Sequence, residues 1–184
     1  YNKRSVELSS DTTSSGITTI RGNDDKVNVF KYTGSSSTSN KLPPFRVTMS
    51  WYDPPSSPIA SGKVLINDLH LDVYVAPMTK KSNTDLVWTR YTGNSGSTGA
   101  TAQDNDDTTD YDQANPLEQV SLNMNAILTR SKEQLQADLT GIMVMVIVRA
   151  PVIAKGTVQE YSMVITSPHG FEKLSQAEAD KIAV

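Results

Sequence analysis

The chain has 184 residues, with 17 Lys and Arg against 20 Asp and Glu, two His, no Cys and a formal net charge of −3. This length suits one domain, or one domain with tails, around a sizeable core. The slightly acidic balance argues against nucleic acid as a partner, because binding to phosphate needs a basic surface. The absence of cysteine excludes a disulfide scaffold, a thiolate zinc site and a cysteine nucleophile.

The sequence begins at Tyr1, without an initiator methionine and without a basic segment followed by an apolar one of the kind that directs targeting. We interpret the chain as a piece of a longer protein. The longest apolar run, Ile142–Val148, is far shorter than a bilayer requires, so no transmembrane segment is expected. Ser5–Ser9 and Ile17–Arg21 are candidate strands near the start.

Short segments rich in β-branched and aromatic residues alternate with turn-forming stretches, a pattern typical of β-strands. In chain order they are Val27–Tyr32, Arg46–Trp51, Leu69–Val75, Leu86–Tyr91, Leu117–Met124, Ile142–Arg149 and Val158–Thr166. Several have period two, so that Val47, Met49 and Trp51 share one face. Ile142–Val148 is apolar throughout, and both of its faces should be covered. We predict an all-β, antiparallel β-sandwich rather than a parallel α/β sheet.

Helix signals are few. Ser131 followed by Gln134 resembles a capping box and predicts a short helical insertion that extends to Leu139. Ser175 followed by Glu178 resembles a second one and predicts a helical tail at the C-terminus. The expected domains are N-terminal strands and a linker at 1–26, the sandwich at 27–170 and the tail at 171–184.

Catalytic machinery of the serine-hydrolase type needs a nucleophilic Ser, a His base and an orienting carboxylate. The chain has only His70, within an alternating strand, and His169, in a turn. It has no Gly-x-Ser-x-Gly motif. We therefore expect no catalytic triad in this segment and do not expect it to be an enzyme.

Calcium suits the residue types better, because it takes six to eight oxygen ligands. The long polar stretch 92–112 has five Asp and no Lys or Arg, and Asp104 and Asp106 are candidate ligands in it. Counted from Asp104, the sixth residue is Thr109 and the twelfth is Asn115, where an EF-hand has Gly and Glu. The alternative interpretation of this stretch is a solvated acidic loop. Asn67 and Asp68 at the entry of one strand, with Asp53 at the end of another, form a second candidate cluster. Their alternative role is to cap turns.

Aromatic residues raise a third hypothesis, because β-sandwiches commonly bind carbohydrate on aromatic platforms. The candidates are Trp51, Tyr52, Trp88, Tyr91 and Tyr111. The period-two pattern places Trp51 in the core, and the same interpretation extends to Trp88.

Two blocks of sequence carry a resemblance to a known family. They are Pro44–Pro55, which reads PFRVTMSWYDPP, and Leu65–Val73, which reads LINDLHLDV. They resemble the "RVTLxWxDPP" and "LVNDLDLxV" blocks of the β-sandwich that follows the catalytic domain in many subtilisin-like serine proteases (subtilases). Asn115–Val120 and the strand Tyr161–Ile165 extend the resemblance, which covers about Val27 to Gly170 in the family's order.

The resemblance implies a jelly-roll-like sandwich of about eight antiparallel strands beside an upstream subtilisin-like catalytic domain that holds the entire triad. This segment would be a non-catalytic accessory domain of a serine endopeptidase, secreted, on the cell surface or in a secretory vesicle. It would stabilise the catalytic domain, assist its maturation or shape substrate access. The alternative is a free-standing carbohydrate-binding or adhesion sandwich.

The resemblance also implies calcium, which relatives often bind in this domain. The positions that match the family's motifs are Asp53, Asn67, Asp68 and Glu118. His70 departs from the motif, since the family usually has Asp there, and the helical insertion is a second departure. Apart from the family, short polar side chains at these strand ends can hydrogen-bond neighbouring loops. We therefore expect these residues to hold loops together, with or without Ca²⁺.

Overall fold

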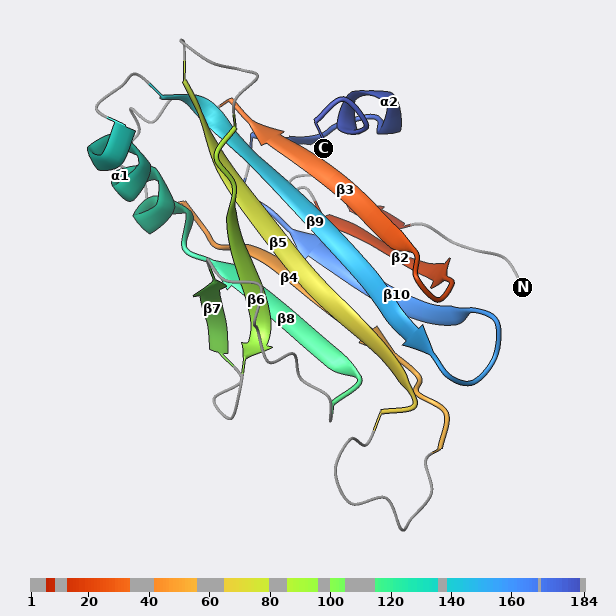
Figure 1. Ribbon diagram of the computed structural model, residues 1–184. Coiled ribbons are helices and arrows are strands. Elements are labelled where there is room, and N and C mark those ends of the chain that lie inside the picture. The colour runs from red at the N-terminus through yellow and green to blue at the C-terminus, as the bar shows by residue number, and fades with distance from the viewer. Residues whose placement is uncertain are drawn as a thin grey trace.

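Two antiparallel β-sheets face each other in the computed structural model, which describes residues 6–8, 13–33, 42–55, 65–79, 86–95, 100–104, 115–135, 139–168 and 170–182 (Figure 1). Sheet A has the order β1 (Val6–Leu8), β2 (Thr13–Ile20), β10 (Gln159–Thr166), β4 (Phe45–Trp51), β8 (Leu117–Leu122). Sheet B has the order β11 (Phe171–Lys173), β3 (Asp25–Tyr32), β9 (Leu139–Ile153), β5 (Asn67–Thr79), β6 (Thr89–Ser95), β7 (Ala100–Asp104).

The strand order is that of a jelly roll. When the short edge strands β1, β7 and β11 are set aside, the sheets read β2-β10-β4-β8 and β3-β9-β5-β6. Numbered along the chain, these eight strands have the orders 1-8-3-6 and 2-7-4-5, which define two interlocked Greek keys. The predicted antiparallel, jelly-roll-like sandwich is confirmed, and the three edge strands are additions to the expected eight.

The sheets extend past the expected limits of the sandwich at 27 and 170. Strand β2 pairs with β10 over eight residue pairs, from Thr13 with Thr166 to Ile20 with Gln159. Strand β11 pairs with the end of β3 in sheet B. Serine and threonine dominate β2, so its hydrophobic pattern is weak, and its place in the sheet comes from the neighbouring strand.

The main core lies between the sheets and follows the period-two pattern. Val47 and Met49 are fully buried and Trp51 nearly so, in agreement with the prediction for that strand. Phe45 makes ring contacts with Phe30 and Phe171, which come from sheet B. These aromatic contacts join the two layers at one end of the sandwich.

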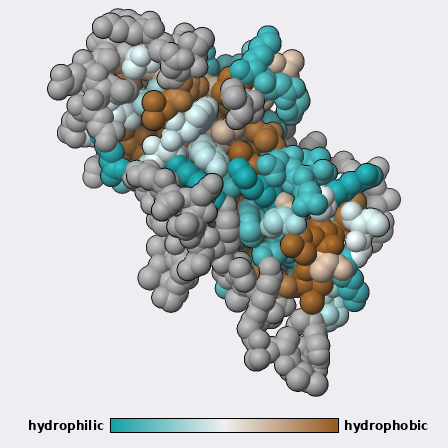
Figure 2. Space-filling view, in the orientation of Figure 1, coloured by the Kyte–Doolittle hydropathy of each residue, from teal (hydrophilic) through white to brown (hydrophobic). Residues whose placement is uncertain are grey.

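A second apolar cluster covers the outer face of sheet B. Met143, Met145 and Ile147 of β9 are buried there under Ala179 and partly buried hydrophobic residues of the C-terminal segment. Both faces of β9 are thus covered, as its continuous apolar sequence predicted. Figure 2 shows this side of the molecule, with a hydrophobic patch near the end of β9 where that strand turns into β10.

The helix α1 (Met124–Leu135) begins earlier than expected. Asn123 is its N-cap, because its side-chain oxygen accepts a hydrogen bond from the backbone N–H of Ala126 (3.1 Å). The predicted capping box at Ser131 is wrong, since this residue lies inside the helix with its side chain buried. Asparagine caps a helix without the Glu or Gln of a capping box, so the pattern search missed the true start.

The helix α2 (Gln176–Ala179) begins at the capping box that the sequence predicted. The Glu178 carboxylate accepts a hydrogen bond from the backbone N–H of Ser175 (3.0 Å). The helix ends at Ala179, and residues 183–184 of the expected tail lie outside the described residues. Within the described ranges, neither helix is long and apolar enough to cross a membrane.

The side of the sandwich at β6 and β8 is closed by a close approach of two backbones. Strand β6 pairs regularly with β5 from Thr89 to Thr92 and then passes against β8 of the other sheet. A Cβ atom on Gly93 would collide with the carbonyl group of Gln119, so only glycine allows this contact. This crossing places β6 beside β8 and the start of α1.

Tyr161 should make the free energy of unfolding fall at alkaline pH. Burial raises the pKa of Tyr161 to about 12, whereas an unfolded tyrosine ionises near pH 10. Because the folded pKa is the higher one, this stabilisation is complete below about pH 10 and is lost as the pH rises toward 12. The loss should reach about 2–3 kcal/mol. Denaturant unfolding between pH 9 and 12 should show a steeper decline for the native sequence than for Tyr161→Phe, and equal slopes would contradict this expectation.

Candidate functional site

Asp53 joins the two sequence blocks that resemble a family. It follows β4, and its carboxylate accepts hydrogen bonds from the backbone N–H groups of Ile66 (2.8 Å) and Asn67 (2.7 Å). Both carboxylate oxygens are engaged, one with each N–H group. The Asp-Pro-Pro turn is thereby fixed to the start of β5, although the intervening residues 56–64 lie outside the described ranges.

Asn67 extends these contacts to a third part of the chain. Its side chain is 1% exposed, donates to the Lys155 carbonyl (2.9 Å) and to Gln159 Oε1 (2.8 Å), and accepts from the Lys155 N–H (2.9 Å). Gln159 in turn donates to the carbonyl of Tyr52 (3.1 Å). We call Asp53, Asn67 and Gln159 the loop-locking cluster. It connects the end of β4, the start of β5 and the hairpin between β9 and β10.

Gln159 was not among the sequence candidates. A glutamine at the start of a strand is an ordinary surface residue by pattern. Its burial follows from its contact with Asn67, which is distant in sequence. The exposed residues beside this cluster include Tyr52, at 85%.

Glu118 connects the two sheets at another point. It is buried on β8 in sheet A, and its carboxylate accepts a hydrogen bond from the backbone N–H of Leu71 in sheet B (2.7 Å). The pairing of β5 with β6 begins one residue after Leu71. The Leu71 N–H therefore has no acceptor in β6, and Glu118 supplies one. Asp68 is also buried, and its carboxylate lies 3.5 Å from Nε2 of His70.

The geometry of Asp53 and Asn67 fits hydrogen bonding to the backbone of neighbouring segments better than calcium coordination. Calcium needs six to eight oxygen ligands. Both oxygens of Asp53 and the side-chain oxygen of Asn67 already accept backbone N–H groups. Across the described part of the chain, no three His, Asp or Glu side chains are grouped so that they could hold a metal.

Only the start of the acidic stretch, up to Asp104, lies in the described part of the chain. The backbone of Asp104 pairs with Arg90 at the end of β7, and its side chain lies outside the description. Asp106 lies wholly outside the described residues, as do Tyr111 and His169. Of the other aromatic candidates, Trp51 is in the core and Trp88 packs against the outer cluster of sheet B.

An unexpected ionic network lies on the outer face of sheet B. Asp72 is fully buried on β5, and its carboxylate meets Arg90 of β6 (2.9 Å) and Arg149 of β9 (2.9 Å). Burial raises the pKa of Asp72, while the two arginines lower it. Arg149 also approaches the half-exposed Asp25 at 4.0 Å and donates to the Tyr74 hydroxyl (3.4 Å). This network connects β3, β9, β5 and β6 across the sheet.

Asp72 alternates with Leu71 and Val73 along β5 and so lies on the face opposite the main core. Arginines from both neighbouring strands cover it there, with Arg90 itself only 11% exposed. Sequence spacing gives no signal for such a network, because its members come from strands that pair only in the folded sheet.

Comparison with known proteins adds no relative. No protein-family model matches this chain, and no curated protein is significantly similar to it.

Proposed function

We propose that this chain is a non-catalytic accessory domain of a subtilisin-like serine endopeptidase, which stabilises the catalytic domain and assists its maturation or substrate access. The observation that supports it is the contact between the two motif blocks. Asp53 of the first block accepts hydrogen bonds from two successive N–H groups at the start of the second. The two motif blocks are thus joined by direct hydrogen bonds. Two blocks that resembled the family by chance would not need to be in contact.

The loop-locking cluster suits a domain that acts by contact. It holds three segments together at one end of the sandwich: the end of β4, the start of β5 and the hairpin between β9 and β10. A loop held by buried hydrogen bonds loses little conformational entropy when a partner binds it. The proposed partner is the upstream catalytic domain, in a secreted, cell-surface or vesicular protein. The triad would belong to that domain.

The test uses the full-length gene product. The reading frame upstream of Tyr1 should encode a Gly-Thr-Ser-type nucleophile segment. Deletion of residues 1–184 should shorten the half-life of peptidase activity at elevated temperature or lower the yield of mature enzyme. The control replaces this domain with an unrelated β-sandwich of similar size. An upstream frame without that segment, or a control as stable as the native protein, would contradict the proposal.

A carbohydrate-binding or adhesion sandwich is the second candidate, and the exposed Tyr52 favours it. An aromatic side chain that is 85% exposed beside a rigid cluster is a suitable platform for a sugar ring. Binding on a glycan array that disappears with Tyr52→Ala would replace the first proposal. Absence of binding across the array would remove the second.

Calcium remains part of the first proposal only as an additional ligand. If it binds, the described contacts favour a place other than Asp53 and Asn67, whose oxygens are engaged with backbone N–H groups. The measurement that separates these cases uses the Asn67 variant described in the Discussion.

A further inference from the structure

The outer face of sheet B carries an apolar surface built from three neighbouring strands. Its buried residues from β3, β5 and β9 are Val29, Ala76, Met78, Met143, Met145 and Ile147. Half of them are methionines, whose unbranched side chains adapt to partners of different shape. The solvent-facing side of an antiparallel sheet normally carries polar residues, so this surface needs a cover.

Part of that cover is the C-terminal segment. We call residues 174–182, which include α2, the strap, and Figure 1 shows α2 outside the two sheets and next to β3. Ala179 is buried against the methionine-rich surface, and Leu174 and Ile182 are partly buried there. Ala179 and Ile182 are three residues apart, so both side chains lie on one side of the helical turn. The surface thus already holds a short amphipathic segment.

Few contacts hold the strap on the sheet. In the described part of the chain, one backbone hydrogen bond joins the two, from the Leu174 N–H to the Val29 carbonyl (2.9 Å). The other hydrogen bonds of the strap lie within it, as in the capping box of Ser175 and Glu178. A helix of four residues is unstable by itself, and ordering the strap costs conformational entropy. Such a segment can open while the rest of the fold stays intact.

The sheet also favours one sign of charge on the segment that covers it. Hydrogen bonds from Ser175 lower the pKa of Glu178, with smaller contributions from the charges of Lys181 and Lys31. Lys31 belongs to β3, so its charge comes from the sheet and not from the strap. An acidic residue at the position of Glu178 is therefore favourable in any occupant of this surface.

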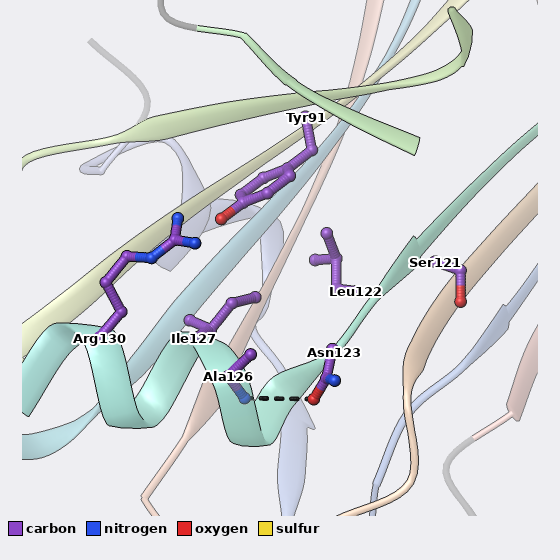
Figure 3. Close-up of a pocket in the computed structure, with 7 residues that line it drawn as sticks. All are labelled: Tyr91, Ser121, Leu122, Asn123, Ala126, Ile127 and Arg130. Carbon is purple, nitrogen blue, oxygen red and sulfur yellow. Dashed lines mark hydrogen bonds between the residues drawn. The ribbon is translucent and has the colours of Figure 1, made fainter. Parts of the chain in front are cut away.

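The pocket where β6 passes the start of α1 is too small for a helix. Figure 3 shows this pocket, which has a volume of about 200 Å³ and a lining that includes Tyr91, Leu122 and Ile127. Pockets for drug-sized ligands have roughly 300–1,000 Å³, and a protein helix is larger than such ligands. The surface under the strap is the better place for a protein helix on the described part of the chain.

We propose that the strap is displaceable and that the surface beneath it docks an amphipathic helix of a protein partner, which takes the place of the strap. The strap shows what this helix must offer: a small residue at the position of Ala179, aliphatic residues at those of Leu174 and Ile182, and an acid at that of Glu178. A longer helix can bury more of the methionine-rich surface than the strap does, because methionine side chains adapt to it. The proposal does not depend on the accessory role proposed above.

The experiment measures how a fluorescent peptide with the sequence of residues 174–184 binds to the complete chain and to its variant Ala179→Asp. A carboxylate is costly to bury among methionines, so the strap of the variant should open. The main core contains no strap residue, and the sandwich should therefore stay folded. The peptide should bind Ala179→Asp with a Kd of about 0.1 mM. It should bind the native chain more weakly by about tenfold or more, because the native strap competes at a millimolar effective concentration.

Ala177→Asp is the matched protein control, because it adds the same charge to the same helix at an exposed position. This control should bind the peptide as weakly as the native chain does. The matched ligand control is the same peptide with Ala179→Asp, which should bind none of the proteins.

Hydrogen exchange of the native chain tests the opening of the strap without any substitution. The amides of Ala179 and Ile182 should exchange faster than those of β9 by about a hundredfold or more. The proposal is overturned if these amides exchange as slowly as those of β9, or if Ala179→Asp binds the peptide no better than Ala177→Asp does. It is also overturned if Ala179→Asp forms a dimer and does not bind the peptide, which would assign the surface to a second copy of the chain.

Discussion

Asp72→Ala is expected to lower the free energy of unfolding by about 3–5 kcal/mol. The carboxylate is fully buried and lies 2.9 Å from a nitrogen of each arginine. Its removal leaves two guanidinium groups close together, and Arg90 is nearly enclosed. An uncompensated charge that cannot reach water is the origin of this effect. Urea denaturation at neutral pH measures it.

The matched control is Asp25→Ala, which removes a carboxylate from the same arginine. Asp25 is 50% exposed and 4.0 Å from Arg149, so its loss should change stability by less than about 1 kcal/mol. If Asp72→Ala were no more destabilising than Asp25→Ala, the network would have no structural role. Salt should weaken the Asp25 contribution and leave that of Asp72 largely unchanged, because buried pairs are screened less.

A second variant separates the loss of a contact from the exposure of an unpaired charge. Replacing the whole network, as Asp72→Leu with Arg90→Met and Arg149→Met, removes the charges together. Buried ion pairs often contribute little beyond the apolar groups that would fill their space. The triple variant should therefore recover most of the stability that Asp72→Ala loses. A triple variant that is less stable than Asp72→Ala would show that the ion pairs themselves stabilise the sheet.

Local patterns predicted the sandwich because several strands keep a clear inner face. Val47, Met49 and Trp51 needed no information beyond their spacing, and the continuous apolar sequence of β9 correctly indicated cover on both sides. The Ser175 capping box was likewise a local signal and was confirmed. The start of α1 was missed because its cap, Asn123, lacks the partner that makes a capping box recognisable.

Interactions between distant strands could not be predicted in the same way. The sequence indicated Asp53 and Asn67 as short polar residues at strand ends, but it did not indicate Gln159 or Lys155 as their partners. Gly93 lets β6 pass close to β8, and no local pattern in either strand indicates this crossing. Register and strand crossing thus determine the polar contacts, whereas periodicity determines which faces are buried.

Asn67→Ala is expected to destabilise the chain by about 2–3 kcal/mol, because it removes the hydrogen bonds that Asn67 makes with Gln159 Oε1 and with both backbone groups of Lys155. Hydrogen exchange should accelerate at the amide of Lys155. The control is Asn125→Ala, which also removes two hydrogen bonds to a distant backbone, those of Leu42. Because Asn125 is only partly buried, water can replace its contacts and the loss should be about 1 kcal/mol.

Thermal unfolding of these proteins in chelator and in millimolar calcium then distinguishes hydrogen bonding from metal binding at Asn67. Metal that binds only the folded chain would raise its stability by about 2.7 kcal/mol at a hundredfold excess over Kd. If the loop-locking cluster acts through hydrogen bonds alone, Asn67→Ala lowers the Tm equally in both conditions. A calcium-dependent Tm that persists in Asn67→Ala would direct attention to another site, whereas one that disappears only in this variant would assign the ion to Asn67.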